Sequence, residues 1–196
     1  MTNKLNVGIL IFDGAEVLDF AGPFEVFSVT SELNNFSLFE VFTVAKSLSP
    51  INAVNGFSVN PKYAFRNSPS IDILIIPGGE GTRKLQTDNE TLNWIKGVYE
   101  DSTFTLSICT GSTLLAVLKL LDHKPYCTHK SIYKEMERLA PSGMPQPKKR
   151  FVQSTDKIYT SAGISAGIDL SFHIVEKLHG KNCSTQTANY MEYNLD

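Results

Sequence analysis

The sequence predicts an α/β fold in which a single doubly wound, mostly parallel sheet carries helices on both faces. Short apolar runs are typical of parallel strands that are covered on both sides, and segments of helical composition alternate with them along the chain. No internal repeat, low-complexity tract or linker interrupts the 196 residues, so we expect one domain spanning residues 1–196. The runs on which this prediction rests are residues 5–12, 39–45, 72–76 and 103–108.

The first strand is expected at residues 5–12, an almost unbroken apolar run. Residues 15–31 then have helical spacing, but Gly22-Pro23 interrupts it. We therefore expect a short first turn, a break, and a helix that starts near Pro23, because proline is favoured at the first helical position. The predicted buried stripe of this helix consists of Phe24, Val26 and Phe27.

The middle of the chain predicts a second strand, a hairpin, a third strand and a helix. Residues 39–45 form the strand, and two short apolar segments around Asn55-Gly56 indicate the hairpin. Residues 72–76 are a buried strand that ends in the sequence PGGEG, residues 77–81. A helix follows at residues 85–100, with Asp88 as its N-cap.

The remaining elements follow the same alternation. The strand at residues 103–108 leads through Cys109 into a helix that ends near Leu121. A last long helix ends before Gly180, a residue that favours helix C-termini. The other elements that we expect are strands at 126–128, 151–154 and 158–162 and helices at 130–139, 165–178 and 186–194.

Composition excludes several classes of function. The net charge is −2 and the pI is near 6.1, which gives no reason to expect binding to nucleic acid or to an anionic membrane. The basic run Lys148-Lys149-Arg150 lies among prolines, and we interpret it as a solvated turn. Three cysteines cannot form a disulfide framework, and we see neither a membrane span nor a signal peptide. We expect a cytoplasmic protein with reduced thiols.

Cys109 is the strongest candidate for a reactive group. It stands between a buried strand and a helix and is followed by small polar residues, which is the layout of a nucleophile elbow. The unpaired N–H groups of the first helical turn favour a thiolate, so we expect a lowered pKa. The alternative is a buried cysteine that packs as a small hydrophobic residue.

Three strand ends should meet at the carboxyl edge of the sheet, where open α/β folds bind ligands. The first carries the carboxylates Asp13, Glu16 and Asp19. Asp13 suits a turn, whereas Asp19 lies in an apolar run that should raise its pKa and fit it for proton exchange with a thiol, although a helix cap is the alternative. The second strand end carries Gly78 and Gly79, and the N–H groups of Gly79 and Thr110 could form an oxyanion-binding pair, or PGGEG could be an ordinary turn.

The four histidines give no metal site. No pair has the spacing of metal ligands, and neither HExxH nor CxxC occurs. Only His129, at a predicted strand end, is expected near Cys109. Because GxGxxG and Walker motifs are also missing, we expect no cofactor and no metal.

The motifs together resemble the ThiJ/PfpI superfamily, and within it the branch of the isonitrile hydratases. The resemblance covers nearly the whole chain and implies a flavodoxin-like fold of the class I glutamine amidotransferase type. The matching stretches are LDFAGPFEVF (18–27), IIPGGEG (75–81), SICTGS (107–112), CTHKSIYKEM (127–136), SAGISAGIDLSFHIVEKLHG (161–180) and MEY (191–193).

The resemblance implies roles for individual residues. Cys109 would be the nucleophile, Asp19 its acid/base partner and Thr110 a hydrogen-bonding residue of the site. The implied reaction is attack of the thiolate on an isonitrile carbon, protonation, and hydrolysis of the thioimidate to an N-substituted formamide. We assign oxyanion stabilisation or binding to Gly78, Gly79, His129 and Ile164. Relatives are commonly homodimers with the site near the interface, so we expect a homodimer that acts on a small molecule.

The sequence also departs from the family's patterns. Thr110 stands where the PfpI-type proteases carry His after the cysteine, which argues against peptidase activity. Lys130 replaces a Trp of a relative's THW motif. The chain stops at Asp196, whereas some hydratases are longer, and no helix-turn-helix region follows of the kind fused to this domain in regulators, so we expect no direct DNA binding.

Two alternatives to the hydratase remain open. The first is a sensor or stress protein without catalytic activity, in which Cys109 is oxidised reversibly. The second is hydrolysis of an amide or a glyoxal-type carbonyl by the same thiolate.

Overall fold

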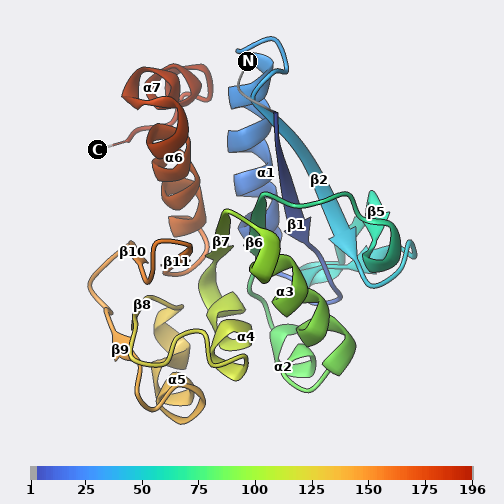
Figure 1. The fold of residues 1–196 in the computed structure, drawn as a ribbon, viewed down its shortest axis with the longest axis vertical. Coiled ribbons are helices and arrows are strands. Elements are labelled where there is room, and N and C mark those ends of the chain that lie inside the picture. The colour runs from blue at the N-terminus through green and yellow to red at the C-terminus, as the bar shows by residue number, and fades with distance from the viewer. Residues whose placement is uncertain (1–3, 196) are drawn as a thin grey trace.

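The central sheet has the parallel, doubly wound arrangement that the apolar runs predict. The computed structural model describes residues 4–195, and within them a seven-stranded sheet has the order β10-β11-β7-β6-β1-β2-β5 (Figure 1). All neighbouring strands in it are parallel except β10 and β11. Its strands are β1 (Leu5–Leu10), β2 (Phe39–Ala45), β5 (Tyr63–Ala64), β6 (Ile73–Ile76), β7 (Phe104–Ser107), β10 (Phe151–Gln153) and β11 (Ile158–Ser161).

Helices cover both faces of this sheet. The helices α1 (Val17–Glu32), α6 (Ala166–His179) and α7 (Lys181–Tyr190) pack together on one face (Figure 1). The strand order reverses direction at β1, so the right-handed crossovers place α3 (Asn89–Asp101) on the opposite face. The short helices α2 (Thr82–Leu85), α4 (Ser112–Val117) and α5 (Tyr133–Leu139) lie beyond the carboxyl ends of β6 and β7 (Figure 1).

The remaining elements are short. Two small two-stranded pairs complete the described residues, β3 (Ile51–Asn52) with β4 (Ser58–Val59) and β8 (Pro125–Tyr126) with β9 (Met144–Pro145). The first is the hairpin predicted around Asn55-Gly56, where both residues have positive φ. Single 3₁₀ turns occur at Val54–Gly56, Phe65–Asn67, Cys109–Gly111 and Lys130–Ile132.

The predicted break at Gly22-Pro23 is wrong, because α1 runs through both residues. Proline in a helix lacks an N–H and crowds the carbonyl four residues earlier. Gly22 has no Cβ to clash with the proline ring, and a Cβ there would lie 2.8 Å from Cγ1 of Ile168 on α6. Close packing of α1 on α6 therefore carries the helix past Pro23.

The predicted apolar stripe of α1 is only partly correct. Val26 and Phe27 are fully buried, but Phe24 is 37% exposed. Phe24 therefore lies at the solvent-facing margin of α1 and not in its buried stripe. The N-cap prediction for α3 is confirmed, since Asp88 accepts a hydrogen bond from the N–H of Glu90, although the helix begins at Asn89 rather than at residue 85.

Candidate active site

Cys109 occupies a strained turn between β7 and α4. Its φ is 55°, a conformation that is costly for a residue with a side chain. The turn is held by its N–H, which donates to the carbonyl of Ala162 at 3.1 Å, and by its carbonyl, which accepts from Oγ1 of Thr128 at 3.0 Å. A Cβ at Gly111 would lie 2.3 Å from the carbonyl oxygen of Ile76, so the turn also requires glycine there. This geometry matches the predicted strand-turn-helix arrangement.

Asp19 comes from the first turns of α1 and is completely buried. Its Oδ2 accepts a hydrogen bond from the N–H of Gly78 at 2.8 Å, whereas Oδ1 has no hydrogen-bond partner among residues 4–195. Burial raises the pKa of Asp19 to about 7, and the negative charge of Glu16 acts in the same direction, while the hydrogen bond from the N–H of Gly78 and the Cys109 thiol oppose the shift. The raised pKa expected for Asp19 is therefore found.

The pKa of Cys109, by contrast, does not behave as the helix terminus alone predicts. Burial raises the pKa of its thiol to about 12, and the charge of Asp19 raises it further, while the N–H groups of Ile164 and Thr110 oppose the shift. The side chain is 5% exposed, and α4 has only six residues, so loss of water outweighs the favourable N–H groups. The lowered pKa expected from the helix terminus is thus corrected to a raised one.

The glycine turn after β6 joins the other two strand ends. The N–H of Glu16 donates to the carbonyl of Gly78 at 2.9 Å. A Cβ at Gly78 would lie 2.5 Å from the N atom of Thr110 and 2.9 Å from Oδ2 of Asp19. Gly79 has a φ of 117°, and a Cβ on it would lie 2.2 Å from the carbonyl oxygen of Gly14. The three strand ends therefore do meet at one edge, in contact at backbone level.

The expected oxyanion pair is not arranged as predicted. The N–H of Gly79 donates to Oγ1 of Thr110 at 2.8 Å, and the Thr110 hydroxyl donates in turn to the carbonyl of Gly79 at 3.1 Å. This N–H is therefore engaged by a side chain and does not face the sulfur freely. The N–H groups that act on the sulfur are those of Thr110 and Ile164. Thr110 instead ties the glycine turn to the cysteine turn.

His129 follows Thr128, which bonds the carbonyl of Cys109, and Ile164 directs its N–H at the sulfur. Nδ1 of His129 lies 2.7 Å from Oγ of Ser131 and accepts from the N–H of that serine at 3.3 Å. A Cβ at Gly163 would lie 2.3 Å from the His129 ring, so glycine there lets the ring lie flat against the backbone. His129, Gly163 and Ile164 line a cavity of about 480 Å³ together with Thr128. The sequence analysis did not assign a role to Thr128 or Gly163. Thr128 lies in the stretch CTHKSIYKEM and Gly163 in the stretch that begins SAGIS, and both stretches match the family's motifs.

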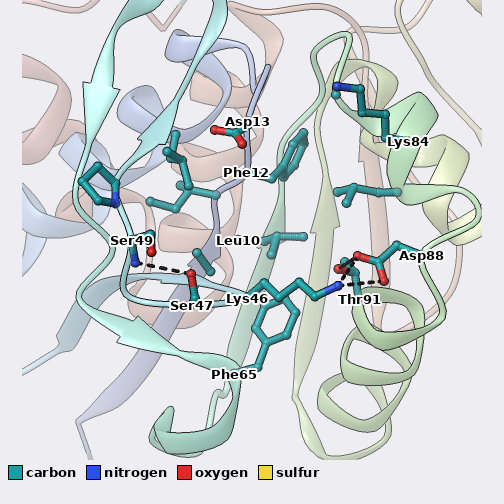
Figure 2. A pocket seen from close by; sticks show the side chains of 16 residues that line it. Leu10, Phe12, Asp13, Lys46, Ser47, Ser49, Phe65, Lys84, Asp88 and Thr91 are labelled. Atoms are coloured by element: carbon teal, nitrogen blue, oxygen red, sulfur yellow. Dashed lines mark hydrogen bonds and ion pairs between the residues drawn. The ribbon is translucent and has the colours of Figure 1, made fainter.

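A second cavity, of about 490 Å³, lies at the carboxyl ends of β1 and β2. Figure 2 shows Lys46 reaching across it toward Asp88, to which its Nζ is 3.0 Å distant. Phe12 and Phe65 form part of its apolar wall (Figure 2). Asp13 borders this cavity and accepts from the N–H of Asn52 at 2.8 Å, as suits the turn role predicted for it.

Residues 4–195 contain no group of three or more His, Cys, Asp or Glu side chains placed to hold a metal. None of their helices combines the length and the apolarity that crossing a membrane requires.

Two proteins of known sequence and one solved structure illustrate what this chain is similar to. An isonitrile hydratase of Pseudomonas putida is 29% identical over 189 residues, which cover 96% of this chain and 78% of the relative. The HTH-type transcriptional regulator GbdR of Pseudomonas aeruginosa is 23% identical, and there the match spans 97% of this chain but only 51% of the regulator. The crystal structure of a ThiJ/PfpI family protein from Pseudomonas syringae has a TM-score of 0.88 and 26% identity, covering 99% of this chain and 77% of that one.

These likenesses agree with a match to a family model. Enzymes and regulators both occur among the relatives, and the similarity to each extends over nearly the whole of this chain. The model of the DJ-1/PfpI family matches residues 6–177, which include most of β1, the glycine turn, Cys109 and most of α6. The chain therefore belongs to the DJ-1/PfpI family.

Proposed function

We propose that this protein is a cysteine-dependent hydratase of a small electrophile, in the manner of an isonitrile hydratase. The observation that carries the proposal is a buried carboxyl with a pKa of about 7 next to the Cys109 thiol. Near neutral pH, such a carboxyl can both accept and return a proton, which general acid–base catalysis requires. The 29% identity to the Pseudomonas putida enzyme supports an isonitrile as the substrate.

The proposed reaction begins from a thiol and an ionised Asp19. As the sulfur bonds to the terminal carbon of R–N≡C, the thiol proton passes to the Asp19 carboxylate and from there to the carbon, which gives the thioimidate R–N=CH–S–Cys109. Water then adds across the C=N bond. The C–S bond breaks, the sulfur recovers a proton, and R–NH–CHO leaves, so that the sum is the addition of one water. Asp19 serves as the proton carrier in both halves.

The N–H groups of Thr110 and Ile164 have a defined part in this scheme. They point at the sulfur and stabilise it as negative charge develops during attack and departure. The raised pKa of the free thiol means that this charge appears only when substrate is present. The site would therefore avoid a permanently reactive thiolate and depend on Asp19 for activation.

Incubation with cyclohexyl isonitrile, followed by NMR detection of N-cyclohexylformamide, tests the proposal. Turnover should be abolished in Cys109→Ala and retained in Cys183→Ser, a partly buried thiol on α7. Wild-type protein that forms no formamide, or equal turnover in Cys109→Ala, would defeat the proposal.

The sensor alternative has weaker support. Oxidation favours exposed cysteines of low pKa, but the Cys109 side chain is 5% exposed and its pKa is raised to about 12. Mass spectrometry after mild peroxide treatment distinguishes the two functions. Selective and reversible oxidation of Cys109 over Cys127 and Cys183, without isonitrile turnover, would favour the sensor.

A further inference from the structure

The cavity beside Cys109 has a marked excess of positive charge. Four cationic side chains line its volume of about 480 Å³, and none of its lining residues is acidic. Lys130 comes from the turn before α5, whereas Lys148, Lys149 and Arg150 come from the loop before β10. The whole chain has a net charge of −2, so this concentration of cations runs against the overall charge.

Three of these cations are uncompensated. Lys130, Lys148 and Lys149 are exposed and form no ion pair within residues 4–195. Arg150 differs, because its Nε donates to Oδ2 of Asp169 at 2.6 Å and its Nη2 donates to Oγ of Ser165 at 3.2 Å. Arg150 is thus held in place and partly neutralised, while the lysines leave a net positive field in a concave surface, where fields are focused.

The cavity shares its wall with the reactive turn. Thr128 and Ala162 line it, and these are the residues whose Oγ1 and carbonyl hold the backbone of Cys109. Ile164, whose N–H acts on the sulfur, lines it as well. A ligand seated here would therefore contact residues that themselves contact Cys109. If the basic run were only a solvated turn, its lysines would not need to line a cavity next to the turn of Cys109.

We propose that the electrophile on which Cys109 acts carries an anionic group, a carboxylate or a phosphate, which the cavity of Lys130, Lys148 and Lys149 binds. This inference names the substrate class and rests on the proposed function for the chemistry at the sulfur. Lysine ammonium groups attract such anions as point charges. The volume is within the range of small-molecule pockets, roughly 300–1,000 Å³.

Alkylation of Cys109 tests the inference without any need for turnover. Iodoacetate and iodoacetamide each form an S–C bond with loss of iodide, and they differ in carrying a negative charge or none. Mass spectrometry gives the rate of alkylation of Cys109 by iodoacetate divided by its rate of alkylation by iodoacetamide. The same ratio is measured for N-acetylcysteine as the reference. We expect the protein's ratio to be higher, and to fall at least about five-fold in the triple variant Lys130→Gln/Lys148→Gln/Lys149→Gln and at 0.5 M salt.

Lys96→Gln is the control, because Lys96 is an exposed lysine of α3 that lines neither the cavity of Lys130, Lys148 and Lys149 nor the cavity at the carboxyl ends of β1 and β2. It should leave the ratio unchanged. Protection of Cys109 by acetate or by inorganic phosphate then shows which anion the cavity prefers. A ratio no higher than that of N-acetylcysteine, failure of iodoacetate to react at Cys109, or an unchanged ratio in the triple variant would overturn the inference.

The two proposals can fail separately. If the inference is correct, isocyanoacetate should have a lower KM than its methyl ester, and the triple variant should remove most of the difference. If neither isonitrile is hydrated but the alkylation preference holds, the hydratase fails and the anion cavity stands. If both isonitriles are hydrated equally well in wild type and triple variant, the hydratase stands and the anionic substrate is rejected.

Discussion

The carboxyl group of Asp19 accepts a hydrogen bond from the main-chain N–H of Gly78 at 2.8 Å, and this contact joins two segments 59 residues apart in sequence. It occupies Oδ2 and leaves Oδ1 without a hydrogen-bond partner within residues 4–195. Asp19 and Cys109 then influence each other's protonation, with pKa values of about 7 and about 12. The chemistry proposed for the site depends on this arrangement.

The pH dependence of activity should follow Asp19 rather than Cys109. The proposed attack needs Asp19 ionised to receive the thiol proton, so kcat/KM should rise with pH through a single ionisation near 7. The measurement is a pH–rate profile for isonitrile hydration between pH 5 and 9. A profile that does not level off above neutral pH but keeps rising up to pH 9 would indicate that a free thiolate is the attacking species and would contradict the assignment.

Asp19→Asn should lose activity and gain stability above neutral pH. Replacing the carboxyl by an amide of the same shape removes the proton acceptor, and we expect a fall in kcat/KM of at least ~10²-fold. In the folded protein, the pKa of Asp19 is about 7, whereas an unfolded aspartate titrates near its model value of 3.8. Between these values the folded state binds the extra proton, so wild-type stability from this group falls as pH rises.

The corresponding measurement is thermal unfolding of wild type and Asp19→Asn at pH 4, 5.5, 7 and 8. The Tm difference in favour of the variant should grow from pH 4 to pH 7 and then level off. A difference that does not vary with pH would show that the carboxyl is not the group that titrates in this range. Asp156→Asn serves as the control, because Asp156 lies in the exposed turn between β10 and β11.

Gly78→Ala should damage the site and the fold together. The new Cβ would lie 2.5 Å from the backbone N atom of Thr110 and 2.9 Å from the Asp19 carboxyl, so the glycine turn must move. We expect a loss of about 1–3 kcal/mol in the free energy of unfolding, as for other overpacked sites, and a strong loss of turnover. Urea denaturation and the formamide assay measure the two effects.

Gly97→Ala provides the matched control for that substitution. Gly97 lies within α3, and a Cβ there would meet no atom within 4 Å. Alanine in a helix interior is favoured over glycine by roughly 0.5–1 kcal/mol, so this variant should be more stable and fully active. Similar destabilisation by both substitutions would contradict the close contact at Gly78.

Thr110→Val tests the hydroxyl that links the cysteine turn to the glycine turn. Valine keeps the shape but leaves the N–H of Gly79 without its acceptor at 2.8 Å. A buried donor without a partner costs about 1–3 kcal/mol, so unfolding should occur at lower urea concentration. The glycine turn also contains Gly78, whose N–H donates to Asp19, so a shift of this turn would displace the Asp19 carboxyl. We therefore expect kcat to fall by about ten-fold or more. Thr110→Ser keeps the hydroxyl and should retain most of the stability to urea and most of the kcat. An unchanged kcat in Thr110→Val would show that Thr110 has no role in the active site.

Local patterns were sufficient for most of the framework. The apolar runs at β1, β6 and β7 predict buried parallel strands, because an unbroken apolar run is visible within a few consecutive residues. Asp88 is predicted as an N-cap for the same reason, since a cap acts within three residues. The placing of Cys109 at a strand-to-helix turn also needed only its immediate neighbours.

Not every short strand can be recognised from such patterns. We did not predict β5 or β9, each of which is two residues long and pairs with a strand distant in sequence. Pro23 likewise stays within α1 because Gly22 packs on Ile168, a contact that no local window contains.

The sequence by itself determined a doubly wound sheet with Cys109, Asp19 and the glycine turn at one edge, because the periodicity of each element and the alternation of strands with helices can be read along the chain. Only the tertiary structure decided the protonation of that site. Burial by distant segments raises the pKa of Cys109 instead of lowering it, and the Thr110 hydroxyl occupies the N–H of Gly79. Desolvation and hydrogen-bond pairing depend on atoms brought together from across the chain, and no spacing along the sequence encodes them.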